Sequence, residues 1–177
     1  YRREFDAAVI GPWVGGYLRG QTPNPCVACN RTVRFGAFLG KAAELGAKFV
    51  ATGHYARILH DSATGRYRLL RSRDPAKDQT YVLHVLSQHQ LARTLFPLGG
   101  LTKSWVREIA ESARLPVAQK PESQEICFVP HGDYVKFVRS HGSTGHGAIV
   151  DTSGTRLGSH SGLEQFTVGQ RRRLNLS

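Results

Sequence analysis

The sequence has 177 residues, of which 40% are hydrophobic and 21% charged, and this balance predicts a folded globular protein and excludes a disordered one. The formal net charge of +11 predicts a polyanionic partner, most simply a nucleic acid, although a solvated basic face without a partner is the alternative. No apolar run reaches the roughly 18 residues of a membrane span, and residues 1–20 lack the pattern of a signal peptide. We therefore expect no membrane partner, and three cysteines, an odd number, fit the reducing cytoplasm.

Both ends of the sequence resemble the middle of a protein chain and not a natural terminus. The chain contains no methionine, begins within a helical pattern at Tyr1 and stops soon after a basic turn. We therefore expect this chain to be an internal fragment of a longer protein.

The first predicted element is a helix over residues 3–18, because its apolar residues recur at helical spacing. Gly11 and Pro12 are expected to disturb it, since proline lacks the N–H that a helix interior needs. Two further prolines fix φ within residues 22–25, which predicts a stiff loop after this helix.

A second helix is predicted over residues 32–45, with Asn30 or Thr32 as its N-terminal cap and a glycine after its end. Residues 48–53 then form a short apolar run that ends in glycine, which is typical of a buried parallel strand. A helix, a loop and a strand in this order indicate an α/β fold.

Shorter elements fill the rest of the chain. In order, we expect a hairpin of residues 55–59 and 66–71, a charged loop over 71–79, helices around 81–86 and 88–95, a helix capped by Thr102, an extended segment over 120–130 with Cys127 at the end of a short strand, a helical turn over 133–138, a hairpin of 148–151 and 156–158, a strand over 162–168 and a basic turn over 169–173.

Three of these elements, the helix after Thr102, the first hairpin and the charged loop, carry further expectations. The helix after Thr102 should turn Val106, Ile109 and Ala110 inward, because they share one helical face. The hairpin and the charged loop predict a strip of basic side chains suited to phosphates, with a solvated edge as the equally weighted alternative. The strip comprises Arg66, Arg68, Arg71, Arg73 and Lys77.

Cys26 and Cys29 form a Cys-x-x-Cys pair directly after the proline loop. A zinc site needs further ligands, and only Cys127 and scattered histidines remain to supply them. A thioredoxin-like redox pair should follow a strand, and two inert buried cysteines are the third alternative. Catalytic sulfur chemistry, with Cys127 as the partner, is the interpretation that we favour.

Gly53 and His54 stand at the carboxyl end of the predicted strand over 48–53, where open α/β sheets bind ligands. Glycine at that place lets the backbone approach a ligand closely. The pair by itself is a weak signal, since a lone histidine is more often structural.

Six ordered blocks of sequence point to one enzyme family. They are Thr22–Arg31, Ala51–Arg57, Lys77–Tyr81, Leu91–Gly99, Ser123–Phe128 and Phe166–Arg171. Together they resemble the tRNA-specific 2-thiouridylases (the MnmA/TrmU family), and the resemblance covers nearly the whole chain.

The resemblance implies a Rossmann-like α/β domain of the PP-loop ATPase type (adenine nucleotide alpha hydrolase-like). Residues 1–130 would be the remainder of this nucleotide-binding and catalytic domain, truncated so that its N-terminal phosphate loop is missing. Residues 131–177 would begin a small β-rich central domain, and the C-terminal β-barrel of the family would also be missing.

The activity that the resemblance implies is a sulfurtransferase reaction, the ATP-dependent 2-thiolation of the wobble uridine of tRNA. ATP, with Mg²⁺, would adenylate the uridine 2-oxygen, and a cysteine persulfide would supply the sulfur. The implied partners are tRNA and a persulfide donor protein, either a cysteine desulfurase or a relay. No bound metal cluster is expected, and this fragment alone is expected to be inactive.

The family's site residues carry over to matching positions of this sequence. Cys29 matches the nucleophile and Cys127 the cysteine that holds the persulfide, so the resemblance implies a disulfide between them during turnover. The remaining matches are Gly53 for ATP, Asn24, Pro25 and Cys26 beside the target base, and His54, Lys77, Asp78 and Gln79 for tRNA contacts.

Two other functions remain open at this point. One is another PP-loop enzyme that thiolates tRNA, although such enzymes often carry paired Cys-x-x-Cys motifs that hold metal clusters. The other is a non-enzymatic, basic RNA-binding module with a structural metal at Cys26 and Cys29. The metal content of the purified protein distinguishes this module from the enzyme.

Overall fold

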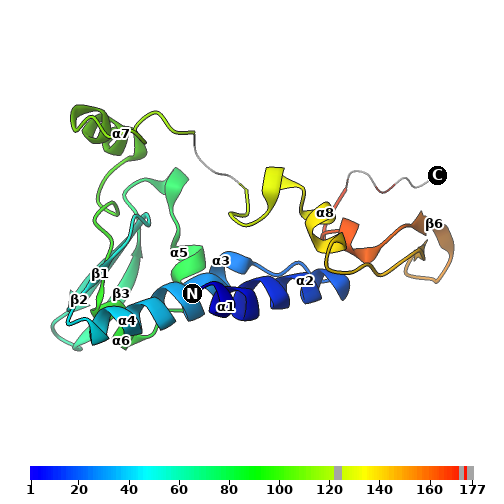
Figure 1. Cartoon of the computed structure of the whole chain (residues 1–177), viewed down its shortest axis with the longest axis horizontal. Coiled ribbons are helices and arrows are strands. Elements are labelled where there is room, and N and C mark those ends of the chain that lie inside the picture. The colour runs from blue at the N-terminus through cyan, green and yellow to red at the C-terminus, as the bar shows by residue number, and fades with distance from the viewer. Residues whose placement is uncertain (122–124, 172–173, 175–177) are drawn as a thin grey trace. The chain divides into compact units, whose positions relative to one another are not determined.

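The computed structural model describes residues 1–121, 125–171 and 174, and the chain divides into two compact units. The first unit comprises Tyr1–Phe5 and Cys26–Glu122, and the second comprises Asp6–Pro25 and Ser123–Ser177. Figure 1 shows the mixture of helices and short strands along the chain. Within the described ranges, no helix combines the length and the apolar character that a membrane crossing requires.

The first unit is built on a helix of three consecutive segments. These are α3 (Pro25–Ala28), the π-helical η2 (Cys29–Phe38) and α4 (Leu39–Glu44), while the short α1 (Arg2–Phe5) belongs to the same unit. The predicted start of this helix at residue 32 is therefore wrong. Proline is well suited to the first helical position, because its φ is already helical and its missing N–H would have no partner there.

Neither of the two predicted caps acts as one. Thr32 lies inside the helix, where its hydroxyl donates a hydrogen bond to the Ala28 carbonyl at 2.7 Å. Asn30 is buried, and its side-chain amide donates to the Val82 carbonyl at 3.1 Å. The amide of Asn30 therefore serves tertiary packing, which the local sequence does not reveal.

The parallel strand is confirmed, but it is shorter than predicted. β1 (Val50–Ala51) pairs in parallel with β4 (Thr94–Leu95). The strand β4 replaces the end of the predicted helix over 88–95, of which α6 (Gln88–Ala92) remains.

The first hairpin is confirmed. β2 (Ala56–Asp61) and β3 (Arg66–Arg71) pair in antiparallel register, from Ala56 opposite Arg71 to Asp61 opposite Arg66. The hairpin is drawn in Figure 1 as two neighbouring arrows, with β1 also labelled there.

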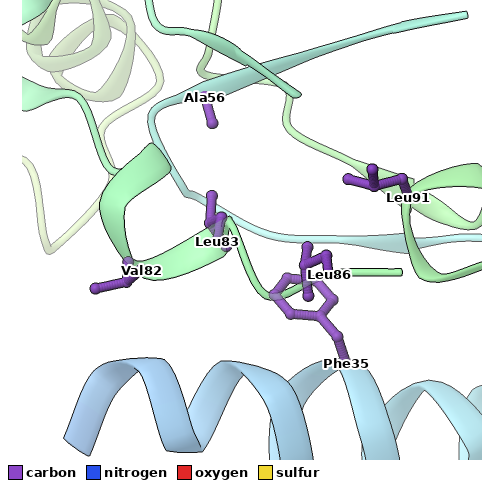
Figure 2. Packing of buried hydrophobic residues seen from close by; sticks show 6 residues of the cluster. All are labelled: Phe35, Ala56, Val82, Leu83, Leu86 and Leu91. Carbon is purple, nitrogen blue, oxygen red and sulfur yellow. The ribbon is translucent and has the colours of Figure 1, made fainter. Parts of the chain in front are cut away.

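The core of the first unit joins the helix to the hairpin. Figure 2 shows Phe35 rising from η2 toward Leu86, and Leu83 of α5 (Thr80–Leu83) pointing toward Ala56 of β2. The buried cluster consists of Phe35, Ala56, Val82, Leu83, Leu86 and Leu91. Burial of such side chains stabilises the unit by about 1.5–3 kcal/mol for each large one, so this cluster fixes η2 against the hairpin.

The helix after Thr102 forms, but its apolar side is not buried. In α7 (Lys103–Ser112) the Thr102 hydroxyl accepts a hydrogen bond from the Trp105 N–H, as predicted for its cap. Ile109 nevertheless remains 47% exposed and Trp105 48% exposed, so the predicted inward face is wrong for this unit.

The second unit begins with η1 (Asp6–Ile10) and α2 (Gly11–Leu18), which confirms the predicted helical stretch. The expected disturbance takes the form of the π-helical turn η1 just before Pro12, a wider turn that accommodates the missing N–H. Trp13 of α2 packs on Phe128 and Phe137 with ring centroids 5.3 Å and 6.0 Å apart. The buried cluster consists of Trp13, Val14, Tyr17, Val129 and Val138.

The second unit also contains the short helix and the second hairpin that the sequence predicts. The short η4 (Pro130–Gly132) leads into α8 (Tyr134–Arg139), which Asp133 caps by accepting the Lys136 N–H at 2.9 Å. The predicted hairpin is confirmed as β5 (Gly147–Val150) and β6 (Arg156–His160).

The predicted strand over 162–168 is wrong. The chain instead forms the 3-10 turn η5 (Leu163–Gln165), which places the fully buried Glu164 against α8. Of the predicted basic turn, residues 172 and 173 lie outside the described ranges, and the described part contains a hydrogen bond from the Gln170 N–H to the Thr167 carbonyl.

Candidate functional site

The two cysteines of the Cys-x-x-Cys pair lie at the start of the long helix. Cys26 is the second helical residue and exposed, whereas Cys29 opens η2 and is half-buried. Asn24, which is exposed, precedes the helix, and the buried Pro25 begins it. The first turn of the helix therefore presents backbone N–H groups and the positive end of its dipole beside Cys26.

Inward-facing neighbours hold Cys29 in place. Val27 packs against the core cluster around Phe35, and the Asn30 amide bonds the Val82 carbonyl. Because Val27, Asn30 and Phe35 fix the buried side of the helix, the half-buried Cys29 lies at the edge between that side and the solvent.

A polar pocket of about 400 Å³ opens at the carboxyl end of β1. Its lining consists of Arg34, Thr52, Gly53, His54 and Gln79. Along the chain, η2 leads into α4 and then into β1, both labelled in Figure 1, and the pocket residues Thr52, Gly53 and His54 directly follow β1. Two predicted site residues at the strand end, Gly53 and His54, are thereby brought together with the predicted Gln79.

His54 is buried, and both of its ring nitrogens have protein partners. Its Nε2 lies 3.1 Å from an Arg34 guanidinium nitrogen, and its Nδ1 lies 2.8 Å from the Thr52 hydroxyl. A guanidinium only donates hydrogen bonds, so Nε2 must be the acceptor and Nδ1 must carry the proton, which it donates to Thr52. The ring is therefore held as one neutral tautomer.

The surroundings of His54 keep it neutral. Burial first, and then the positive charge of Arg34, lower the pKa of His54 from 6.5 to about 4. The rings of Phe35 and Phe96 lie 5.9 Å and 5.8 Å away. At neutral pH this histidine can accept a hydrogen bond but cannot supply a positive charge.

Gly53 leaves space at the pocket. A Cβ atom added there would meet only the Leu98 Cδ1 atom, at 3.6 Å, which is an ordinary van der Waals contact. The glycine is therefore not needed for packing, and its missing side chain leaves room for a ligand to approach the backbone.

The predicted tRNA loop of residues 77–79 is firmly organised. The Asp78 carboxylate accepts hydrogen bonds from the Ser72 N–H at 2.8 Å and from the Thr80 hydroxyl. Gln79 is tied to Tyr55, whose N–H donates to the Gln79 side chain at 2.9 Å. Lys77 is the last residue of the 3-10 turn η3 (Pro75–Lys77) and directly precedes these hydrogen-bonded residues.

The predicted basic strip is not continuous. Tyr67 and Leu69 pack toward the core, so Arg66 and Arg68 lie on the opposite face of β3, since side chains alternate along a strand. Arg71 shares the core-facing side and lies near Asp78. Burial acts to raise the pKa of Asp78, but the hydrogen bonds from Thr80 and Ser72, and then the charge of Arg71, outweigh burial and lower the pKa.

Cys127 belongs to the second unit and is exposed. The predicted extended strand is wrong here, because the Val129 N–H donates to the Ile126 carbonyl and closes a turn that contains Cys127. Ile126, Phe128 and Val129 pack into the second core, so the thiol stands on an anchored turn.

The sequence did not single out Arg34 or Thr52 as site residues. They meet His54 through side chains up to 20 residues apart in the chain, and no local motif encodes such a contact. The one local indication is the position of Thr52 two residues before His54, a spacing at which the two side chains can meet.

No disulfide joins the three cysteines, and the described part of the chain contains no group of three or more histidine, cysteine or acidic side chains that could hold a metal ion.

Comparison with known proteins connects these features to a family. Residues 1–131 match the family model described as the tRNA methyl transferase HUP domain, and residues 135–177 match its PRC-barrel domain. The chain belongs to this family. The predicted PP-loop-type α/β fold, followed by the start of a β-rich domain, is thereby confirmed.

Several curated relatives in this family are named tRNA-specific 2-thiouridylase MnmA. Those of Moorella thermoacetica and Geobacter metallireducens are 52% and 53% identical over 100% of this chain. The relative from Chloroflexus aggregans is 52% identical over 99% of it. The resemblance to 2-thiouridylases is confirmed, and the chain spans about half the length of these relatives, 50%, 48% and 49% respectively.

Proposed function

We propose that the protein containing this chain is an ATP-dependent tRNA 2-thiouridylase, with tRNA as its substrate. The observation that supports this most directly is the identity of about half of all positions with relatives that carry this name. The net charge of +11 supports a polyanionic substrate. A cytoplasmic location belongs to the same proposal, as does a persulfide donor protein.

The proposed site residues have distinct tasks. Cys29 is the nucleophile and Cys127 carries the persulfide. Asn24, Pro25 and Cys26 would lie beside the target base, and His54, Lys77, Asp78 and Gln79 would serve tRNA binding. We also propose a domain boundary after residue 130.

The pocket at Gly53 has properties that fit an anionic nucleotide. The glycine leaves the strand end open, the pocket measures about 400 Å³, and a guanidinium lines it. A bound nucleotide, with Mg²⁺, would supply the activation that turns the uridine 2-oxygen into a leaving group.

The two thiols account for the transfer of sulfur with balanced electrons. The terminal sulfur of the Cys127 persulfide attacks carbon 2 of the activated base, and the activated oxygen leaves. The Cys29 thiolate then attacks the Cys127 sulfur, which breaks the bond to the base sulfur and forms a Cys29–Cys127 disulfide. A thiol reductant must return two electrons to this disulfide before the next turnover.

The test replaces each cysteine by serine in the full-length protein and measures 2-thiouridine in tRNA. Cys29→Ser and Cys127→Ser should both abolish product while tRNA binding stays nearly intact. Cys26→Ser is the matched control and should have a milder effect, because the transfer needs only two thiols. Normal turnover in Cys29→Ser would contradict the mechanism.

A further inference from the structure

Arg34 is held in an unusual way for a surface arginine. Its residue is exposed on η2, yet one guanidinium nitrogen donates to the buried Nε2 of His54 at 3.1 Å. His54 is in turn fixed by its bond to the Thr52 hydroxyl. An exposed arginine normally samples many rotamers, so this support removes conformational freedom before any ligand binds.

The hydrogen-bond partner of Arg34 is the neutral ring of His54, which leaves the positive charge of Arg34 uncancelled. A carboxylate would position the guanidinium and also cancel its charge. A neutral imidazole positions it and leaves the full positive charge available. Among the residues that the structure describes, no carboxylate forms an ion pair with Arg34.

The position of Arg34 directs this charge to the candidate site. Its side chain lines the polar pocket beside Gly53 at the carboxyl end of β1. It also follows Cys29 by five residues within the π-helical η2, where hydrogen bonds join residues i and i+5, so the two residues are one helical turn apart. A guanidinium has five N–H donors, of which the bond to His54 uses one.

We propose that Arg34 binds a phosphate group of a substrate in the polar pocket, and that His54 is a positioning residue that aims the guanidinium. This inference rests on the proposed function for the identity of the substrate. A phosphate of the nucleotide and a phosphate of the tRNA backbone share the chemistry that the guanidinium recognises, and the experiment separates them.

The first experiment measures the dissociation constants of ATP, inorganic pyrophosphate and tRNA for the full-length protein. Arg34→Gln should weaken one class of ligand about ten- to a hundredfold, as expected for the loss of a hydrogen-bonded charge, and Arg34→Lys should recover part of the loss. Weaker ATP and pyrophosphate binding assigns a nucleotide phosphate, whereas weaker tRNA binding alone assigns the backbone. Arg107→Gln is the control, because it removes the same charge from the exposed α7.

The second experiment separates positioning from fold. His54→Gln keeps a neutral acceptor for Arg34, whereas His54→Leu fills a similar volume without one. We expect His54→Gln to bind within about threefold of wild type and His54→Leu to match Arg34→Gln, with circular dichroism confirming that both variants fold.

Two results would overturn the inference: equal ligand affinities in Arg34→Gln and wild type, or equal losses in His54→Gln and His54→Leu. These binding measurements do not depend on turnover. A protein that binds phosphate through Arg34 but forms no thiouridine would contradict the proposed function and leave this inference standing.

Discussion

Gly53 and Gly99 lack side chains for different physical reasons, and the difference gives a test at the scale of single residues. A Cβ at Gly53 would make one ordinary contact, with Leu98 at 3.6 Å. We expect Gly53→Ala to fold normally and to weaken ATP binding, because the added methyl group takes up space at the pocket that we propose for the nucleotide. Calorimetric titration with ATP and thermal unfolding measure the two effects.

Gly99→Ala is the structural counterpart. A Cβ there would lie 1.7 Å from the Ala56 carbonyl oxygen, so β2 would have to move. This variant should lose stability or fail to fold. If Gly53→Ala were as unstable as Gly99→Ala, the glycine at the pocket would be a packing residue and its nucleotide role would be refuted.

Asn30 is expected to matter for stability as well as for activity. Its buried amide joins η2 to the Val82 carbonyl, so Asn30→Ala leaves that carbonyl without this donor. The free energy of unfolding should fall by about 1–3 kcal/mol, and thiolation should fall because Cys29 is adjacent. Thr32→Ala removes only a local hydrogen bond on the exposed side and should change stability by less than about 0.5 kcal/mol.

At the scale of elements, the turn η3 carries Lys77, for which we propose a contact with tRNA. Asp74 fixes this turn by accepting the Ala76 N–H at 3.1 Å and the Lys103 N–H at 2.9 Å. Lys77→Ala should lower the slope of log affinity for tRNA against log salt by about one unit, since each neutralised phosphate contributes about 0.7–0.9. Filter binding over a range of salt concentrations measures the slope.

Lys41→Ala is the matched control for Lys77. Lys41 is paired with Glu44 at 2.8 Å on the exposed side of α4, and the slope should not change. Equal slopes for Lys77→Ala and wild type would mean that Lys77 belongs to a solvated face.

Glu164 ties η5 to α8 and makes the second unit sensitive to acid. Its carboxylate accepts hydrogen bonds from Arg139 at 2.9 Å and from Thr144 at 3.0 Å. Burial alone would raise the pKa of Glu164, but these bonds outweigh burial and lower the pKa from 4.5 to about 2.

A lowered pKa in the folded state stabilises the protein at a pH above about 4.5, and this contribution disappears as the pH falls toward about 2. Glu164→Gln should therefore lower the free energy of unfolding at pH 7 by about 1–3 kcal/mol, and the difference from wild type should shrink toward pH 2. Urea unfolding at several pH values measures it. A difference that stays constant from pH 7 to pH 2 would show that the charge of Glu164 does not stabilise the unit.

At the scale of the whole molecule, the two proposed thiols belong to different compact units. Sulfur transfer requires their sulfur atoms to come within about 2 Å, with Cα atoms within roughly 7 Å. We predict that oxidation forms the Cys29–Cys127 disulfide more readily when tRNA is bound. Peptide mapping under non-reducing conditions detects the pair.

The alternative outcome of this mapping is equally clear. If only Cys26 and Cys29 form a disulfide, with and without tRNA, the transfer mechanism is wrong and the Cys-x-x-Cys motif is a redox pair.

The sequence by itself determined the features that depend on neighbouring residues. The caps at Thr102 and Asp133 form because each side chain accepts a hydrogen bond from the N–H three residues onward. The two hairpins form because alternation and turn residues act over a few positions. The six ordered blocks, from Thr22–Arg31 to Phe166–Arg171, likewise sufficed for the resemblance to the family, because each is a short local sequence.

Only the tertiary structure decided the features that depend on distant partners. Asn30 is a buried donor and not a cap, because Val82, 52 residues away, offers its carbonyl. Residues 163–165 form a 3-10 turn because Glu164 must reach Arg139 on α8. The aim of Arg34 likewise depends on a histidine 20 residues later in the chain. Hydrogen bonds and packing between remote segments set these geometries, and residue spacing contains no record of which segments will meet.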